Sequence, residues 1–159
     1  MCIHNLSNRI GTCSSSKGDK LEGDATLESG QYMTSPNCEY SFWLETDGNL
    51  MLYKGLTNGR TNLWASQTVG KGTAPYTLKM QAHDHHLVLY DSAGDTIWYT
   101  DVYGGNWEDG AYLSLQDDGN LIVYDGDGDA MWMTSTAGGK ISTEYGTGTK
   151  LEKGKRLIY

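Results

Sequence analysis

The sequence predicts an all-β protein built from three repeated antiparallel units. Glycine is abundant, with 21 of 159 residues, whereas proline occurs only twice, and tyrosine and tryptophan are prominent. No stretch of ten or more residues has the apolar spacing of an amphipathic helix. Instead, three segments match one another, which is typical of a repeat architecture. They are SFWLETDGNLMLY (41–53), LKMQAHDHHLVLY (78–90) and YLSLQDDGNLIVY (112–124).

A tryptophan follows each matched segment. Trp64, Trp98 and Trp132 are separated by two equal steps of 34 residues. Three units of this size cannot each bury an apolar face alone, so we expect them to pack around a common axis. Because a large ring repeated beside aliphatic strands is typical of a core, the tryptophans are predicted near the centre or between units.

Alternation assigns the two faces of the strands in the first and third repeats. Asp-Gly pairs at 47–48 and 118–119 fall where a tight turn would make a hairpin of each repeat. The predicted core positions are Phe42, Leu44, Leu50, Leu52, Leu113, Leu115, Leu121 and Val123. The predicted exposed positions are Glu45, Asp47, Asn49, Met51, Tyr53, Gln116, Asp118, Asn120, Ile122 and Tyr124.

The second repeat breaks this alternation. Leu78 and Met80 share a parity that Leu87 and Leu89 do not. One extra residue, most simply a β-bulge near Gln81 to His83, would return both halves to the core.

The exposed rows combine amide, carboxylate and phenol groups with one apolar side chain. Such groups suit the hydroxyls and ring carbons of a sugar, although any half-buried strand also needs a polar solvent face. Here the residues resemble a known signature. The spacing Gln-x-Asp-x-Asn-x-Val-x-Tyr marks the bulb-type (monocot, snowdrop-like) mannose-binding lectins, and residues 116–124 differ from it only by Ile122 in place of valine.

The resemblance covers residues 19–136, including the leader DKLEGDATLESGQYMTSPN. It implies a β-prism II fold, with three four-stranded antiparallel sheets around a pseudo-threefold axis. It also implies a non-enzymatic protein that binds α-mannose with no metal and no other cofactor. In the family, Asp and Asn hold the axial 2-hydroxyl, Gln the 3-hydroxyl and Tyr the 4-hydroxyl, while Val packs on the ring.

Carried over by position, the resemblance defines three candidate sites. The third site is complete, with Gln116, Asp118, Asn120, Ile122 and Tyr124. The first site is expected to be weaker or silent, since Glu45 lacks the amide donor of Gln; its other members are Asp47, Asn49, Met51 and Tyr53. The second site is doubtful, because His86 replaces Asn and either Ala82 or Gln81 takes the Gln position; it keeps Asp84, Val88 and Tyr90.

The bulk composition restricts the partners. A formal net charge of −8 argues against nucleic acid, because neutralising phosphates requires clustered Lys and Arg. The sequence contains no run of eighteen apolar residues, so no membrane span is predicted. The first residues do not have the pattern of a signal peptide, and both a secreted and a cytoplasmic location stay open. The three cysteines, at 2, 13 and 38, cannot all be paired within one chain, and the sequence does not decide which two form a disulfide. Asn5 begins a glycosylation sequon.

The expected domain organisation is an extension at 1–18, a lectin domain at 19–136 and a tail at 137–159. In the tail, LEKGKRL (151–157) mirrors LESGQYM (27–33) in the leader, so it is predicted to form a strand. That strand would be exchanged with a partner chain, as in the dimers of this family, or would open a second domain. A solvated basic tail is the alternative.

Several competing interpretations concern the acidic and histidine residues. Asp125, Asp127 and Asp129 begin like a calcium loop, but an EF-hand needs Gly at position six and Glu at position twelve, and a hairpin turn is favoured. A metal site at His83, His85 and His86 lacks further ligands. A glycosidase would need paired carboxylates in one cleft. A lectin-like module that has lost sugar binding and contacts proteins remains the alternative function.

Overall fold

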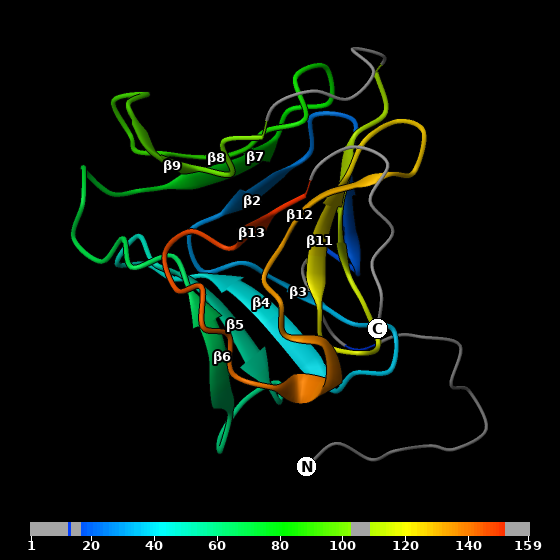
Figure 1. Cartoon of the computed structure of the whole chain (residues 1–159). Coiled ribbons are helices and arrows are strands. Elements are labelled where there is room, and N and C mark those ends of the chain that lie inside the picture. Colours follow the sequence, from blue (N-terminus) through cyan, green and yellow to red (C-terminus); the bar gives the residue numbers. More distant parts are fainter. Residues whose placement is uncertain (1–12, 14–16, 103–108, 152–159) are drawn as a thin grey trace.

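The computed structural model describes residues 13, 17–102 and 109–151. These residues form three antiparallel sheets that face one another around a shared core (Figure 1). The first sheet comprises β3 (Tyr32–Thr34), β4 (Tyr40–Leu44), β5 (Leu50–Lys54) and β6 (Thr61–Ala65). The second comprises β2 (Thr26–Glu28), β7 (Thr77–Met80), β8 (Leu87–Tyr90) and β9 (Thr96–Tyr99). The third comprises β1 (Lys20–Glu22), β10 (Tyr112–Leu115), β11 (Leu121–Tyr124), β12 (Ala130–Met133) and β13 (Thr149–Lys150).

Each repeat supplies three consecutive strands of one sheet, and the leader supplies one strand to every sheet. β1 pairs with β10, β2 with β7 and β3 with β4, all antiparallel. The leader therefore ties the three repeats together. The third sheet differs from the four-stranded expectation because β13 adds a fifth strand at the edge of β12.

The tryptophan prediction is confirmed. Trp64, Trp98 and Trp132 lie at the centre of the core, with ring centroids 5.6–5.8 Å apart and every pair edge to face. The edge of each ring thus meets the electron-rich face of another, which is a favoured aromatic geometry. The inward positions predicted from alternation in the first and third repeats are also fully buried.

The second repeat keeps both halves in the core, as predicted, but without a bulge between β7 and β8. Leu78 pairs with Leu89 and Met80 with Leu87 in an unbroken register. The extra residue lies in the connecting turn, 81–86, where the other repeats have the shorter turns 45–49 and 116–120. His85 there adopts a left-handed φ of 64°. A turn accommodates an insertion more easily than a strand because no ladder hydrogen bond is lost.

The segment after β12 folds back onto the same chain. It includes a 3₁₀ turn, η1 (Ala137–Gly139), and then runs past β6, where Ser142 N donates to Leu63 O and Gly146 N to Ala65 O (Figure 1). β13 completes the path by pairing with β12. Residues 137–151 therefore pack in the same unit as residues 19–102 and 109–136. The predicted strand at 151–157 lies outside the described residues beyond Leu151.

The returning segment also covers the tryptophan cluster. Trp64 Nε1 donates to Glu144 O at 2.9 Å, Trp98 Nε1 to Gly146 O at 2.7 Å and Trp132 Nε1 to Thr147 O at 2.7 Å. Each sheet thus contributes one indole donor to the same short stretch of backbone. We call residues 144–147 the indole cap. A buried indole nitrogen without an acceptor would carry a desolvation cost, so the cap removes that cost in all three sheets.

A disulfide attaches Cys13 to the turn between β3 and β4 of the first sheet. Cys13 is bonded to Cys38, 25 residues further along the chain. Cys2 and the sequon at Asn5 lie outside the described residues. Within the described part of the chain, no helix has the length and apolar character needed to cross a bilayer.

Candidate functional site

The three candidate sites occupy the same hairpin in each sheet. In every case a side-chain oxygen of the aspartate accepts a hydrogen bond from the backbone nitrogen two residues further on. The accepting pairs are Asp47 with Asn49 (3.0 Å), Asp84 with His86 (3.0 Å) and Asp118 with Asn120 (2.8 Å). The aspartate therefore shapes the turn with one oxygen, while the carboxylate keeps a second oxygen for other partners.

The tyrosine and the first residue of each site also contact one another. Tyr53 donates to Glu45 Oε1 at 3.0 Å, and Gln116 Nε2 donates to the Tyr124 hydroxyl at 2.5 Å. In the second sheet the Gln81 amide reaches the Tyr90 hydroxyl. The sequence allows either Gln81 or Ala82 at this position, and the structure places Gln81 there, with Ala82 buried. All three hairpins thus bring their first and last polar groups together.

The third site is less open than alternation predicts. Asn120 is only 1% exposed and Ile122 is fully buried, so the expectation that both lie on an exposed face is wrong. The side chains of Gln116, Asp118 and Tyr124 are half-buried and remain accessible. Alternation identifies the core face of a strand but cannot tell whether other segments cover its opposite face. In the first site, by contrast, Asn49 and Met51 are both half-buried.

Asn120 is held by residues that the sequence analysis missed. Its Oδ1 accepts from Thr134 Oγ1 and from the Thr136 backbone nitrogen, each at 3.2 Å. The hydroxyls of Thr134 and Thr136 lie 2.7 Å apart, and Thr136 Oγ1 donates to Gly119 O at 2.7 Å. This network occupies the amide oxygen, while Nδ2 donates to the Met133 sulfur at 3.3 Å.

The first site contains the same network with Ser66 and Thr68. Asn49 Oδ1 accepts from Ser66 Oγ at 3.1 Å and from Thr68 N at 3.2 Å, and Thr68 Oγ1 donates to Gly48 O at 2.6 Å. The shared sequence signal is Trp-x-Ser/Thr-x-Thr after each hairpin, at 64–68 and 132–136. Reading two residues and four residues beyond each repeated tryptophan would have found it.

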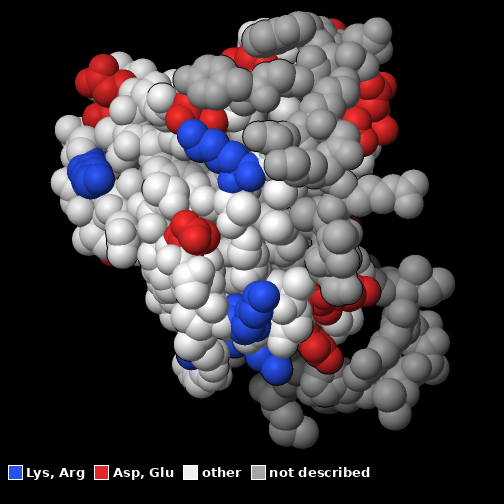
Figure 2. All heavy atoms as spheres, in the orientation of Figure 1, with Lys and Arg blue, Asp and Glu red and all other residues white. Residues whose placement is uncertain are grey.

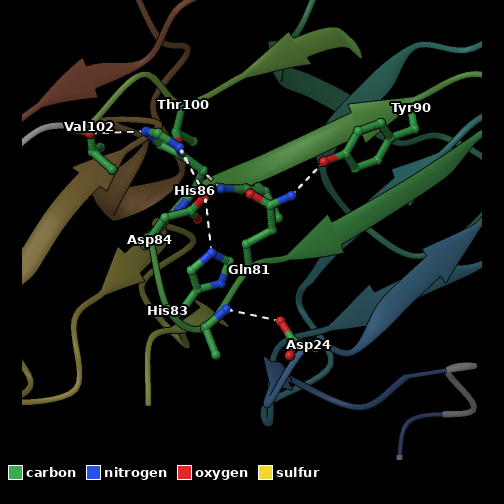
Figure 3. Close-up of polar contacts among 10 residues, drawn as sticks. Asp24, Gln81, His83, Asp84, His86, Tyr90, Thr100 and Val102 are labelled. Carbon is green, nitrogen blue, oxygen red and sulfur yellow. Dashed lines mark hydrogen bonds and ion pairs between the residues drawn. The ribbon is translucent and has the colours of Figure 1, made fainter. Parts of the chain in front are cut away.

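The second site lacks this support. Val102 stands where the other repeats have Thr68 and Thr136, and the His86 ring nitrogen Nε2 lies 3.0 Å from the Val102 carbonyl oxygen (Figure 3). His86 Nδ1 lies 3.6 Å from an Asp84 oxygen. With the oxygen and nitrogen of its amide exchanged, Gln81 accepts a hydrogen bond from the Tyr90 hydroxyl and donates to both Asp84 oxygens, at 3.1 and 2.8 Å. The Asp84 carboxylate is therefore engaged within the protein.

The first site has an altered electrostatic character. Desolvation by burial, followed by the charge of Glu45 and its hydrogen bond, raises the pKa of Tyr53 from 10.0 to about 12, although the Arg60 charge opposes the rise. The Tyr53 hydroxyl is thus occupied as a donor to Glu45. A sugar hydroxyl in this site would meet a carboxylate acceptor where the third site offers an amide.

We expect the Tyr53 phenol in the folded protein to ionise near pH 12 rather than at its ordinary pKa of 10.0. Below pH 10 the phenol is protonated in the folded and unfolded chains, and between 10 and 12 the unfolded chain loses its proton first. The contribution of Tyr53 to stability is therefore lost as pH rises through this window. Ultraviolet difference titration of Tyr53→Phe should lack a tyrosine component that ionises near pH 12 in the unsubstituted protein. Identical titration curves for the two proteins would contradict this assignment.

The competing motifs do not assemble into chemical sites. Asp125 Oδ1 accepts from the backbone nitrogens of Asp127 (3.0 Å) and Asp129 (2.9 Å), which is turn geometry. Across residues 13, 17–102 and 109–151, no group of three or more His, Cys, Asp or Glu side chains is arranged to hold a metal ion. On the face in Figure 2 the Lys and Arg side chains form separate small groups without a continuous basic surface.

Solved structures of monocot mannose-binding lectins have a similar architecture. The structure resembles a monomeric monocot mannose-binding lectin from Gastrodia elata, with TM-score 0.63 and 32% identity over 75% of this chain and 98% of that one. It also resembles the mannose-specific agglutinin of snowdrop (Galanthus nivalis), solved with methyl-α-D-mannoside, with TM-score 0.56 and 28% identity over 67% and 88% of the two chains.

A viral protein is a further relative. A putative lectin of Acanthamoeba polyphaga mimivirus is 30% identical over 83 residues, which is 52% of this chain and 39% of that protein. The chain therefore spans well under half the length of this relative. No family model matches the sequence.

Three antiparallel sheets around one core, each carrying the same polar hairpin, define a β-prism II protein of the lectin class. The chain belongs to the monocot, snowdrop-type mannose-binding lectin family. This family is non-enzymatic, which sets aside the glycosidase alternative. The geometry agrees, because Asp47, Asp84 and Asp118 lie in the hairpins of three different sheets rather than in one cleft.

Proposed function

We propose that this protein binds α-mannose and mannose-containing glycans, without a metal, through the third site. The observation that carries the proposal is the Gln116, Asp118 and Tyr124 constellation on the β10–β11 hairpin. All three side chains are half-buried, and one carboxylate oxygen of Asp118 already positions the Asn120 backbone nitrogen at 2.8 Å. The snowdrop relative, solved with methyl-α-D-mannoside, supports a mannoside as the ligand.

In this proposal the second Asp118 oxygen and the Asn120 amide receive the 2-hydroxyl. Gln116 receives the 3-hydroxyl and Tyr124 the 4-hydroxyl. Because Asn120 and Ile122 are buried, a mannose ring reaches them only if the groups that cover them shift. Such a shift would weaken binding of a single sugar, since part of the binding free energy is used to open the site. The first site is less buried at Asp47, Asn49 and Met51. It has Glu45 in place of the glutamine, however, and so lacks the glutamine amide.

Titration with methyl-α-D-mannoside tests this function. We expect binding at about millimolar strength, roughly −4 kcal/mol, which is ordinary for one sugar in a shallow site. Excess chelator should leave the affinity unchanged, because no metal participates. Methyl-α-D-glucoside, which differs at the 2-hydroxyl, serves as the matched control and should bind more weakly. Absence of mannoside binding at high protein loading would favour the protein-interaction module.

We also infer a homodimer formed by exchange of terminal strands, which would place several sites on one assembly. β13 is the segment suited to exchange, because it pairs along the edge of β12 and could make the same pairing with a partner's β12. Linked sites would raise avidity by about a hundredfold or more without new contacts. A light-scattering mass of about twice 17.5 kDa is expected. A mass of one chain would reject the dimer, and the Gastrodia relative is monomeric.

A further inference from the structure

The first sheet carries a cavity that the mannose proposal does not use. The loop between β5 and β6 is three residues longer than its equivalents, since Trp64 follows Tyr53 by eleven residues and the later pairs are eight apart. This loop, together with Trp43, Tyr53 and Arg60, lines an open surface cavity of about 530 Å³. The remaining lining consists of residues 56–59. A volume of this size accommodates one or two sugar rings.

Arg60 is held in a fixed orientation against the aromatic side chains. Its guanidinium carbon lies 3.9 Å from the Tyr53 ring centroid and 5.0 Å from that of Trp43. Trp43 is itself supported, because Tyr32 stacks on it with centroids 4.0 Å apart and its Nε1 donates to Ser41 Oγ at 3.0 Å. Cation–π contact with two rings therefore limits the freedom of the guanidinium before any ligand arrives.

The guanidinium retains its hydrogen-bonding capacity. Within the described ranges, Arg60 makes neither a hydrogen bond nor an ion pair with another residue. Glu45 lies nearby in the first site, but its carboxylate accepts from the Tyr53 hydroxyl and forms no ion pair with Arg60. Five N–H donors in a planar fork are thus left for solvent or a ligand.

The lining of the cavity selects the kind of ligand. Among the described residues that line the cavity, Arg60 is the only charged one and none is a carboxylate, although the protein has a net charge of −8. A planar guanidinium pairs with a carboxylate through two parallel, charge-assisted hydrogen bonds. Thr57 and Asn58 supply a hydroxyl and an amide for sugar hydroxyls, while Leu56 and Trp43 supply apolar contact.

We propose that this cavity is a subsite for a carboxylate-bearing sugar, with Arg60 pairing to the carboxylate and Tyr53 shared with the first site. The inference rests on the proposed function only in taking the chain to be a glycan-binding protein. It also gives the first site a ligand of its own, because Glu45 replaces the glutamine that a mannose site needs. A glycan in which a carboxylate-bearing sugar is linked to a neutral sugar would occupy both the cavity and the first site.

The test compares methyl-β-D-glucuronide with methyl-β-D-glucoside. The two differ only at carbon 6, which is a carboxylate in the first and a hydroxymethyl group in the second. By calorimetry or nuclear magnetic resonance titration, we expect the glucuronide to bind at least about tenfold more tightly, as charge-assisted hydrogen bonds allow. Arg60→Gln should remove that difference. Arg60→Lys, which keeps the charge but not the fork, should remove part of it. Lys71→Gln, at an exposed loop, is the matched control and should change nothing.

Equal affinity for the two glycosides, or a glucuronide affinity unchanged in Arg60→Gln, would overturn the inference. Circular dichroism and thermal melting of the Arg60 variants confirm that each is folded. Mannoside binding without glucuronide binding rejects this inference alone. Glucuronide binding without mannoside binding rejects the third-site mannose proposal and leaves the cavity assignment standing.

Discussion

Trp132→Ala is expected to lower the free energy of unfolding by about 3–5 kcal/mol, the usual cost of removing a buried tryptophan side chain. The Trp132 ring is fully buried and contacts the edges or faces of both other core tryptophans, with centroids 5.6 and 5.8 Å away. The substitution also leaves the Thr147 carbonyl of the indole cap without its donor. Urea or guanidinium unfolding, with the disulfide intact, measures the change.

Trp132→Phe separates the two contributions. Phenylalanine keeps much of the ring packing but has no N–H group, so it should cost less than alanine while still losing the hydrogen bond to Thr147 O. A loss below about 1 kcal/mol in Trp132→Ala would contradict a central role for this ring, because core truncations of this size cost several times more.

Asp118→Asn is expected to reduce mannoside affinity by more than about tenfold, since a hydrogen bond to a charged group contributes about 1.5–3 kcal/mol. The substitution is conservative for the fold. Asparagine retains an oxygen that can accept from the Asn120 backbone nitrogen, the 2.8 Å bond that shapes the turn. Only the carboxylate that would accept from the sugar is removed. Isothermal titration with methyl-α-D-mannoside gives the change directly.

The other two repeats supply matched controls. Asp47→Asn and Asp84→Asn make the same chemical change in the equivalent turns, whose hydrogen bonds are each 3.0 Å. We expect a smaller effect for Asp47 and none for Asp84, whose carboxylate is near His86 and Gln81. If Asp118→Asn leaves binding intact while Asp47→Asn abolishes it, the first site is the mannose site.

The repeat and its faces were predictable because they depend on periodic side-chain patterns. Leu113 and Val123 face the core for the reason that alternation gives, and the 34-residue step places Trp98 and Trp132 in equivalent positions. The extra residue of the second repeat was correctly counted but wrongly located. Parity reports that a residue has been added between Met80 and Leu87, not whether it belongs to a strand or to the turn.

The return of the tail and the covering of the third site were not predictable from side-chain patterns. The indole cap accepts through main-chain carbonyls, which every residue possesses, so residues 144–147 carry no distinctive sequence signal. Likewise, nothing in the alternation around Asn120 indicates which groups cover it. The cysteine pairing could not be predicted for a similar reason. Three cysteines allow three alternative pairs, and only the fold brings Cys13 to Cys38.

The indole cap makes the cohesion of the three sheets depend on four residues beyond the last repeat. Detaching that segment would leave one unpaired indole donor in each sheet at the same time, so the loss would be shared by all three. A repeat protein whose units contact only neighbours can fray from one end. Here such fraying is opposed, because the free energy of holding the C-terminal segment is coupled to every sheet, and the prism and its closing segment should unfold as one cooperative unit.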